Sequence, residues 1–160
     1  MVKTGLLIRK AEVKDIEGIM ELLRQVLEVH AKAYPKIFKS NTTKYSAREL
    51  EVLINDERLE IFVAIDGDKV VGHAFVMGQI QEETENMYPD KILYIDDICV
   101  DSSERGKHVG SALFDYVKQY AKENGYKRIT LNVWEKNEAA KAFYEAMGME
   151  KLKTMMQLYI

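Results

Sequence analysis

The chain has few residues of the kinds that cross-link or ligate: one cysteine, three histidines and two prolines among 160 residues. A lone cysteine excludes an intrachain disulfide, and its spacing from the histidines is not that of a metal site, so we expect no metal. No apolar run reaches the roughly 18 residues needed to cross a bilayer, and no secretory signal pattern is present. These absences predict a cytoplasmic protein without a membrane partner.

Charge of one sign is not in excess either, because 23 basic residues stand against 26 acidic ones and the formal net charge is -3. Such a chain has no global basic field, so we expect no nucleic-acid partner and only local cationic patches. A chain of this length buries roughly 70% of its unfolded surface around one core. We therefore expect a single domain over residues 1–160.

Hydrophobic periodicity alternates between strand and helix along the chain. The expected helices cover residues 16–30, 46–55, 109–122 and 137–147. The expected strands cover residues 6–9, 61–65, 70–80, 92–100, 128–134 and 149–159. A tight hairpin at Asp66-Gly67 joins the second and third strands. The first two helices form a candidate substrate lid, with the irregular residues 33–45 between them. The order predicts an α/β (α+β) fold with a mixed sheet, in which a helix joins the parallel strands at 92–100 and 128–134.

The junction between the strand at residues 92–100 and the next helix has the features of an anion site. The first-turn amides of a helix have no intrahelical acceptor, and the helix dipole adds partial positive charge there. Gly106 and Gly110 allow a phosphate to approach the backbone closely. Arg105, Lys107 and His108 add cationic or donor groups, so this turn is predicted to bind a phosphate.

These residues resemble the phosphate-binding motif of the GNAT superfamily of acyl-CoA N-acyltransferases, which reads Gln/Arg-x-x-Gly-x-Gly/Ala. The matching stretch is Arg105-Gly106-Lys107-His108-Val109-Gly110, with His108 where the family usually has glycine. The resemblance continues through residues 8–11, 66–72 and 137–148. It implies a central mixed sheet with helices on both faces and a splayed parallel strand pair that admits acetyl-CoA. It also implies that the protein is able to form a homodimer.

Acyl transfer to an amine requires three groups at the site. Because free amines have a pKa of about 10, a carboxylate or a water held by it must take a proton, and Asp96 and Asp97 are the candidates. A backbone amide within residues 98–100 can stabilise the oxyanion. The resemblance implies that Tyr144 protonates the departing thiolate. The coenzyme contacts expected from the anion site and the resemblance are Ile98, Cys99, Val100, Arg105, Gly106, Lys107, His108, Val109, Gly110, Ser111, Asn137 and Lys141.

Adjacent strand residues point to opposite faces, so at most one of the two aspartates is expected to face the thioester. We favour Asp96, which shares a face with Tyr94, Ile98 and Val100. A β-bulge in this strand would instead turn Asp97 toward the thioester.

Each of the other candidates also has a simpler interpretation. Tyr144 can be a core aromatic, Asn137 can serve only as a helix N-cap, and His108 can be an exposed first-turn residue. Cys99 is expected to be a small core residue and not a nucleophile. The acidic residues between 82 and 90 form either a solvated loop or a surface that attracts a cationic substrate.

No phosphate-binding loop of the Walker A type and no dinucleotide fingerprint occurs. The sequence therefore predicts an N-acetyltransferase that moves an acetyl group from acetyl-CoA to a primary amine, on a small molecule or a peptide, by direct attack in a ternary complex. The alternatives are a non-catalytic acyl-CoA-binding or regulatory domain, an O-acyltransferase and a protein N-terminal acetyltransferase.

Overall fold

The computed structural model describes residues 5–160 and contains five strands and four α-helices in that range. In chain order they are β1 (Leu6–Lys10), α1 (Ile16–Ala33), α2 (Ala47–Ile54), β2 (Leu59–Asp66), β3 (Lys69–Gln81), β4 (Asp90–Val100), α3 (Val109–Glu123), β5 (Arg128–Leu131) and α4 (Glu138–Ala146). Short 3-10 turns, η1 (Val13–Asp15) and η2 (Ser102–Glu104), precede α1 and follow β4.

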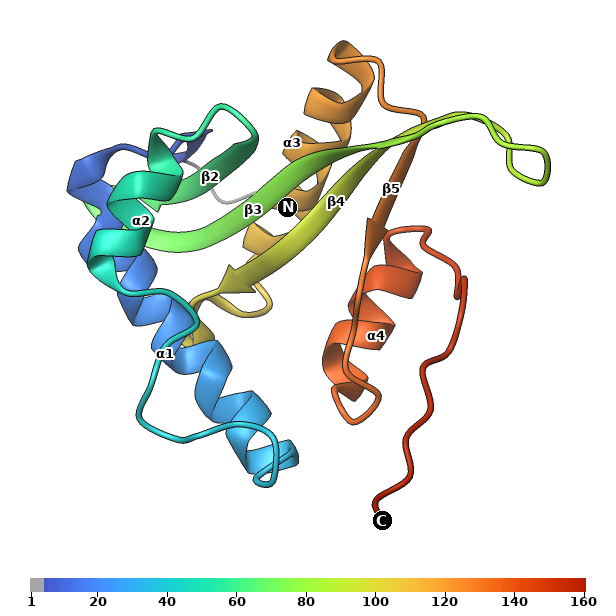
Figure 1. Ribbon diagram of the computed structural model, residues 1–160. Helices are drawn as coiled ribbons and strands as arrows, with labels where there is room; N and C mark the ends of the chain where they lie inside the picture. The colour runs from blue at the N-terminus through green and yellow to red at the C-terminus, as the bar shows by residue number, and fades with distance from the viewer. Residues whose placement is uncertain (1–4) are drawn as a thin grey trace.

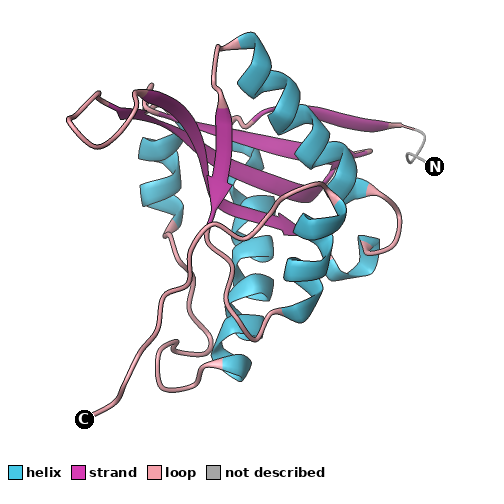
Figure 2. Ribbon diagram, turned by 90° about the vertical axis from the view of Figure 1, so that its right-hand side faces the viewer, coloured by secondary structure: helices cyan, strands magenta, loops and turns pink. Residues whose placement is uncertain are grey.

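The strands form one sheet in the order β1-β2-β3-β4-β5, antiparallel throughout except for the parallel pair β4 and β5. Helices cover both faces (Figures 1 and 2). On one face Leu22 and Leu23 of α1 and Leu50 of α2 are fully buried in a cluster with Phe75 of β3. On the other face Leu113 of α3 lies in a second cluster, against which α4 packs. The predicted mixed sheet with helices on both faces is confirmed.

Local sequence signals set most element boundaries. Ser46 and Glu49 form a reciprocal capping box at the start of α2, in which Ser46 Oγ accepts from the Glu49 amide at 3.2 Å. Gly67 has a φ of +60° in the turn between β2 and β3, a conformation that glycine adopts without strain. The predicted hairpin and the predicted helix after Ser46 are therefore confirmed.

Strand β4 extends beyond the end of its parallel partner β5. Its pairing with β5 runs from Ile92 opposite Arg128 to Ile95 opposite Leu131 and then stops, while β4 stays paired with β3 as far as Val100. The backbone of residues 96–100 is therefore unpaired on the side that faces β5. This splay, confirmed as predicted, is visible in Figure 1 where the lower ends of β4 and β5 move apart.

Two expectations about strands were wrong. The strand expected over residues 128–134 ends at Leu131, and no strand occurs over residues 149–159, which follow α4 without regular structure. The alternation of apolar and polar residues there is a strand pattern, but a strand forms only where a partner supplies hydrogen bonds, and within residues 5–160 no strand pairs with this segment. No helix within residues 5–160 is long and apolar enough to cross a membrane.

Candidate active site

A β-bulge places the two acidic residues of β4 where the sheet splits. The register of β4 against β3 shifts so that Phe75 lies opposite Asp97 and Val76 opposite Ile95, which leaves Asp96 as the extra residue. Asp96 bonds to Tyr45, whose ring stacks on Phe75 at 5.6 Å, and Asp97 bonds to His73 of β3. Both carboxylates thus reach partners on the α1 and α2 side of the sheet, and the expectation that they point to opposite faces was wrong because of the bulge.

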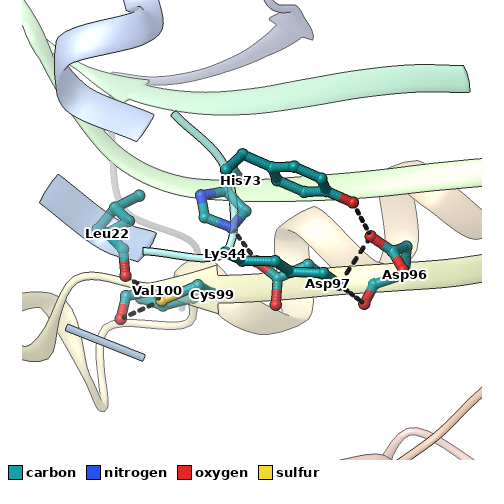
Figure 3. Close-up of polar contacts among 8 residues, drawn as sticks. Leu22, Lys44, His73, Asp96, Asp97, Cys99 and Val100 are labelled. Carbon is teal, nitrogen blue, oxygen red and sulfur yellow. Dashed lines mark hydrogen bonds and ion pairs between the residues drawn. The ribbon is translucent and has the colours of Figure 1, made fainter. Parts of the chain in front are cut away.

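Asp97 is paired with a histidine that sequence reasoning did not assign to the site. His73 is fully buried, and its Nε2 lies 2.6 Å from Asp97 Oδ2 (Figure 3). His73 Nδ1 is buried without a hydrogen-bond partner among the described residues. Burial raises the pKa of Asp97, but the hydrogen bond from His73 and the positive charge of nearby Lys44 outweigh it and hold that pKa below its usual value. Asp97 is therefore ionised at neutral pH.

Asp96 is bound instead to the segment between α1 and α2. Its Oδ2 accepts from Lys44 Nζ and from the Tyr45 hydroxyl, each at 2.8 Å (Figure 3). Burial and the hydrogen bond to Asp96 raise the pKa of Tyr45, so this phenol stays protonated. Lys44 thus pairs with the charge of Asp96 and Tyr45 helps to orient it, and Asp96 ties the candidate lid to β4 just beyond the point where its pairing with β5 ends.

Tyr144 of α4 and Tyr45 are two phenols within electrostatic reach of Asp97, and Tyr144 is the one that does not bond to Asp96. Burial raises its pKa, and the charges of Asp97 and Cys99 raise it further. A phenol in this environment keeps its proton at neutral pH. The ring also packs at 5.4 Å from Phe143 and 6.4 Å from Phe114, so Tyr144 contributes to the core as well.

Aromatic residues connect the segment after β5 with the C-terminal end of α1 and the residues that follow it. Trp134, after β5, lies 5.0 Å from both Tyr34 and Phe38, and His30 of α1 stacks on Phe38 at 5.1 Å. The backbone amide of Lys136 donates to the Tyr34 hydroxyl at 2.9 Å, which ties the same two segments together. Burial lowers the pKa of His30 although Asp97 raises it, so His30 is neutral at neutral pH.

The predicted phosphate site is the N-terminus of α3. No side chain caps it and no acidic residue lies in its first turn, so its amides remain available to an anion. His108 precedes the helix in a left-handed conformation with a φ of +62°, where the family motif has glycine. A Cβ at Gly110 would lie 3.4 Å from the Phe143 ring, so this glycine also permits α4 to pack against α3.

The remaining predicted residues lie in varied surroundings. Asn137 caps α4 by accepting from the Ala140 amide at 3.2 Å, and its contact with the coenzyme stays a prediction. Lys141 Nζ forms ion pairs with Glu135 at 2.9 Å and with Glu138 at 3.0 Å. These two carboxylates balance its positive charge. Cys99 is buried and its pKa is raised to about 12, mainly by burial, so its thiol stays protonated at neutral pH.

Two other features do not take part in the site. The acidic connector joins β3 to β4 at the end of the sheet away from the splay (Figure 1), which argues against its guiding a cation toward Asp96. Two hollows in the surface lie beside α2 and are lined mainly by residues 48–61, with none of the candidate site residues. Within residues 5–160 no group of three or more potential metal-ligating side chains occurs.

Sequence reasoning missed His73, His30, Lys44, Tyr45 and Trp134. Each comes from a segment far from β4 in the sequence, and no local spacing connects them. The one usable signal was a histidine in the middle of the apolar strand at 70–80, because a buried polar group needs a partner and Asp97 is its acidic partner.

Comparison with known proteins agrees with this geometry. The family described as "Acetyltransferase (GNAT) family" matches residues 23–149. An uncharacterized N-acetyltransferase in the pepI 3'region of Lactobacillus delbrueckii subsp. lactis is 27% identical over 157 residues, covering 92% of this chain and 86% of the relative.

Solved structures share the fold over nearly the whole chain. A mutant of the BH1408 protein from Bacillus halodurans superimposes with a TM-score of 0.92 and 31% identity, covering 96% of this chain and 99% of that one. An aminoglycoside acetyltransferase from an uncultured soil metagenomic sample has a TM-score of 0.76 at 20% identity, covering 100% and 98%, and so shows the fold alone. With the splayed β4 and β5 and the uncapped α3, these matches show that the chain belongs to the GNAT family of acetyl-CoA-dependent N-acetyltransferases.

Proposed function

We propose that this protein transfers the acetyl group of acetyl-CoA to a primary amine by direct attack in a ternary complex. The observation that carries the proposal is the splay of β4 and β5 at the bulge of β4, where the ionised Asp97 and the protonated Tyr144 lie within electrostatic reach of each other. A base and an acid whose pKa values are moved apart by their surroundings suit a reaction that takes one proton and returns another.

The coenzyme is proposed to follow the exposed backbone of the splay. Its pyrophosphate suits the first-turn amides of α3, with Arg105, Lys107 and His108 around them. Its pantetheine arm has amide groups, which can hydrogen-bond to the unpaired edge of β4 at residues 96–100. This course leads the thioester to the bulge, where an amide within residues 98–100 can donate to the oxyanion.

Asp97 is proposed as the proton acceptor, in place of the Asp96 that sequence reasoning favoured. Asp96 is bonded to two donors, Lys44 and Tyr45, whereas Asp97 is bonded to His73 alone and lies within electrostatic reach of Tyr144. A carboxylate with a lowered pKa is too weak a base for a free ammonium. It can accept the proton from the nitrogen after the C–N bond forms, directly or through a water, because the attached nitrogen is then far more acidic.

Tyr144 is proposed to complete the transfer. As the tetrahedral intermediate collapses, the carbon–sulfur bond breaks and the electron pair goes to sulfur, which takes the phenolic proton. Solvent then returns a proton to the phenolate. The raised pKa of Tyr144 makes it a donor that does not lose its proton before the thiolate forms.

The test is turnover with acetyl-CoA and a panel of amines, amino acids and peptides, with products identified by mass. Tyr144→Phe should lower kcat by roughly 10²–10⁴, as expected when a positioned general acid is lost, while coenzyme affinity changes little. Tyr120→Phe is the matched control, because Tyr120 is a partly buried tyrosine that packs on Phe62 at 5.1 Å.

Three outcomes would contradict the proposal. Coenzyme binding without turnover of any amine would indicate a non-catalytic acyl-CoA-binding domain. Products acetylated on oxygen alone would indicate an O-acyltransferase. A Tyr144→Phe variant that turns over as fast as Tyr120→Phe would remove the phenol from the mechanism.

A further inference from the structure

The middle of β3 carries a polar side chain in apolar surroundings. His73 is fully buried, and the residues around it in the strand, from 70 to 76, are buried as well. Its ring meets the Phe75 ring edge-on, with centroids 5.1 Å apart. Burying a polar ring is unfavourable unless its nitrogen atoms have partners. A histidine at this position therefore needs a polar neighbour, and β4 supplies one.

That neighbour is Asp97. His73 stands opposite Cys99 in the pairing of β3 with β4, so Asp97, two residues earlier in β4, is its diagonal neighbour on the same face. His73 Nε2 lies 2.6 Å from Asp97 Oδ2 (Figure 3), while Nδ1 is buried with no partner in the described part of the chain. A protonated ring would leave a buried N–H unpaired at Nδ1. Hydrogen bonding therefore assigns the neutral ring with its hydrogen on Nε2, which donates to Asp97.

This contact uses one oxygen of Asp97 and leaves the other free. Within residues 5–160 no donor reaches Oδ1, yet Oδ1 is not a fully buried atom, and 13% of the Asp97 side chain stays exposed. The terminal torsion of a carboxylate is broad unless an oxygen is held. Because His73 holds Oδ2, the direction of Oδ1 is fixed.

No other group around Asp97 makes a comparable contact. The titratable groups that face it come from every element packed there: His30 of α1, Lys44 and Tyr45 between α1 and α2, Cys99 of β4 and Tyr144 of α4. Among the described residues, His73 alone donates a hydrogen bond to the Asp97 side chain. Burial raises the pKa of Asp97, and the bond from His73 is the largest of the effects that lower it.

We infer that His73 is a positioning residue of the acetyl transfer, which holds Asp97 by Oδ2 and so presents Oδ1 to the proton of the acceptor nitrogen. The inference rests on the proposed function, in which Asp97 is the proton acceptor. After the C–N bond forms, an N–H bond breaks, its electron pair stays on nitrogen, and the proton goes to Oδ1 directly or through a water. The hydrogen of His73 stays on Nε2, and Asp97 later returns the proton to solvent.

Two substitutions that differ by one methylene test this role. His73→Gln can place an amide N–H where Nε2 stands, whereas the shorter His73→Asn places it near Nδ1, out of reach of Asp97. His73→Asn should lower kcat/KM by about tenfold to a hundredfold near neutral pH, as expected when a reacting group is misplaced. His73→Gln should recover most of that loss. In an Asp97→Asn background neither substitution should lower the rate further, because His73 acts through Asp97.

A second measurement needs no turnover. The carbon-13 shift of the Asp97 carboxyl, followed against pH by NMR, reports its ionisation directly. Without the donor, burial is less opposed, so the pKa of Asp97 should be higher in His73→Asn than in the wild type, and close to the wild type in His73→Gln. The acid side of the kcat/KM profile should move in the same direction, since the ionisation of the amine is common to all the proteins.

Thermal unfolding shows whether each variant is folded at the assay temperature. His73→Leu, which fills the space of the ring without a donor, replaces His73→Asn if the latter does not fold. Three results would overturn the inference alone: equal rates without and with the donor, an unmoved Asp97 titration in His73→Asn, or a further loss of rate in the Asp97→Asn background. Wild-type turnover by Asp97→Asn itself would remove the proton acceptor of the proposed function, and this inference with it.

Discussion

At the scale of single residues, the two aspartates of β4 differ in their partners and should differ in their contribution to rate. Asp97→Asn removes the proposed proton acceptor and should lower kcat/KM by roughly 10²–10⁴ near neutral pH. Asp96→Asn keeps an oxygen for Lys44 and Tyr45 and should cost less. The measurement is the pH–rate profile of both variants with the best amine of the panel.

The shape of that profile separates a catalytic loss from a structural one. If Asp97 accepts the proton, the deficit of Asp97→Asn should shrink as pH rises, because hydroxide and water then take the proton in its place. A deficit that stays constant with pH, together with a lowered unfolding temperature, would mean that Asp97 acts only by holding His73. A larger loss of kcat/KM in Asp96→Asn than in Asp97→Asn would instead make Asp96 the proton acceptor, as the sequence suggested.

His108 has an unfavourable backbone conformation that can be measured as stability. A non-glycine residue in the left-handed region destabilises the folded state by on the order of 1–2 kcal/mol. Replacing it with glycine removes this strain, but glycine also gives the unfolded chain more conformational entropy, which cancels part of the gain. His108→Gly should therefore raise the free energy of unfolding by up to about 1 kcal/mol in urea titrations. Lys107→Gly, at a position without positive φ, is the control and should lower it. A loss of stability in His108→Gly would show that the imidazole makes a compensating interaction.

At the scale of elements, Asp101 holds the turn between β4 and the phosphate site. Its carboxylate accepts from the Ser103 amide at 2.9 Å and the Ser103 hydroxyl at 2.7 Å, and Lys69 Nζ lies 3.0 Å away. The Ser103 hydrogen bonds and Lys69 lower its pKa to about 2 against the effect of burial. The loop that positions α3 is thus attached to the first residue of β3.

This shift predicts a pH dependence of stability. A carboxyl whose folded pKa is lowered stabilises the fold above its unfolded pKa of about 4, and the contribution is lost as pH falls through about 2. Asp101→Asn should therefore lower the unfolding free energy at neutral pH by about 1–2 kcal/mol, a range reduced because Lys69 is solvent-exposed. Denaturant titrations of both proteins should converge as pH approaches 2. A difference that does not change with pH would mean that the lost contacts, and not the charge, carry the effect.

At the scale of the whole molecule, coenzyme binding should appear as stabilisation. Coenzyme A at a hundred times its dissociation constant adds about 2.7 kcal/mol, which for a domain of this size raises the unfolding temperature by about 5–10 °C. The shift should shrink as salt is added, because the contact with the pyrophosphate is ionic.

A substitution in α3 tests where the anion binds. Ser111→Asp places a negative charge in the first turn, where the helix dipole favours it, so the ligand-free protein should be at least as stable as the wild type. The same charge repels the pyrophosphate, so the shift caused by coenzyme A should be largely lost. Ser102→Asp, on the exposed η2 turn, is the control. An undiminished shift in Ser111→Asp would place the pyrophosphate elsewhere.

The sequence alone determined those features that depend on neighbouring residues. The apolar stripe of α1, the Ser46 capping box, the Asp66-Gly67 hairpin and the Asn137 cap each need only a few consecutive residues, and the structure has all of them. The parallel pair β4 and β5 also followed, because a helical crossover between two strands leaves few other arrangements.

Only the tertiary structure decided how distant segments meet. Whether Asp96 or Asp97 pairs with a histidine depends on one bulged residue in the register of β4 against β3. His30, Lys44 and Trp134 join the site from three separate segments. The strand pattern at 149–159 could not reveal that this segment does not pair with β5, because an alternating pattern specifies a face to bury and not the partner that buries it.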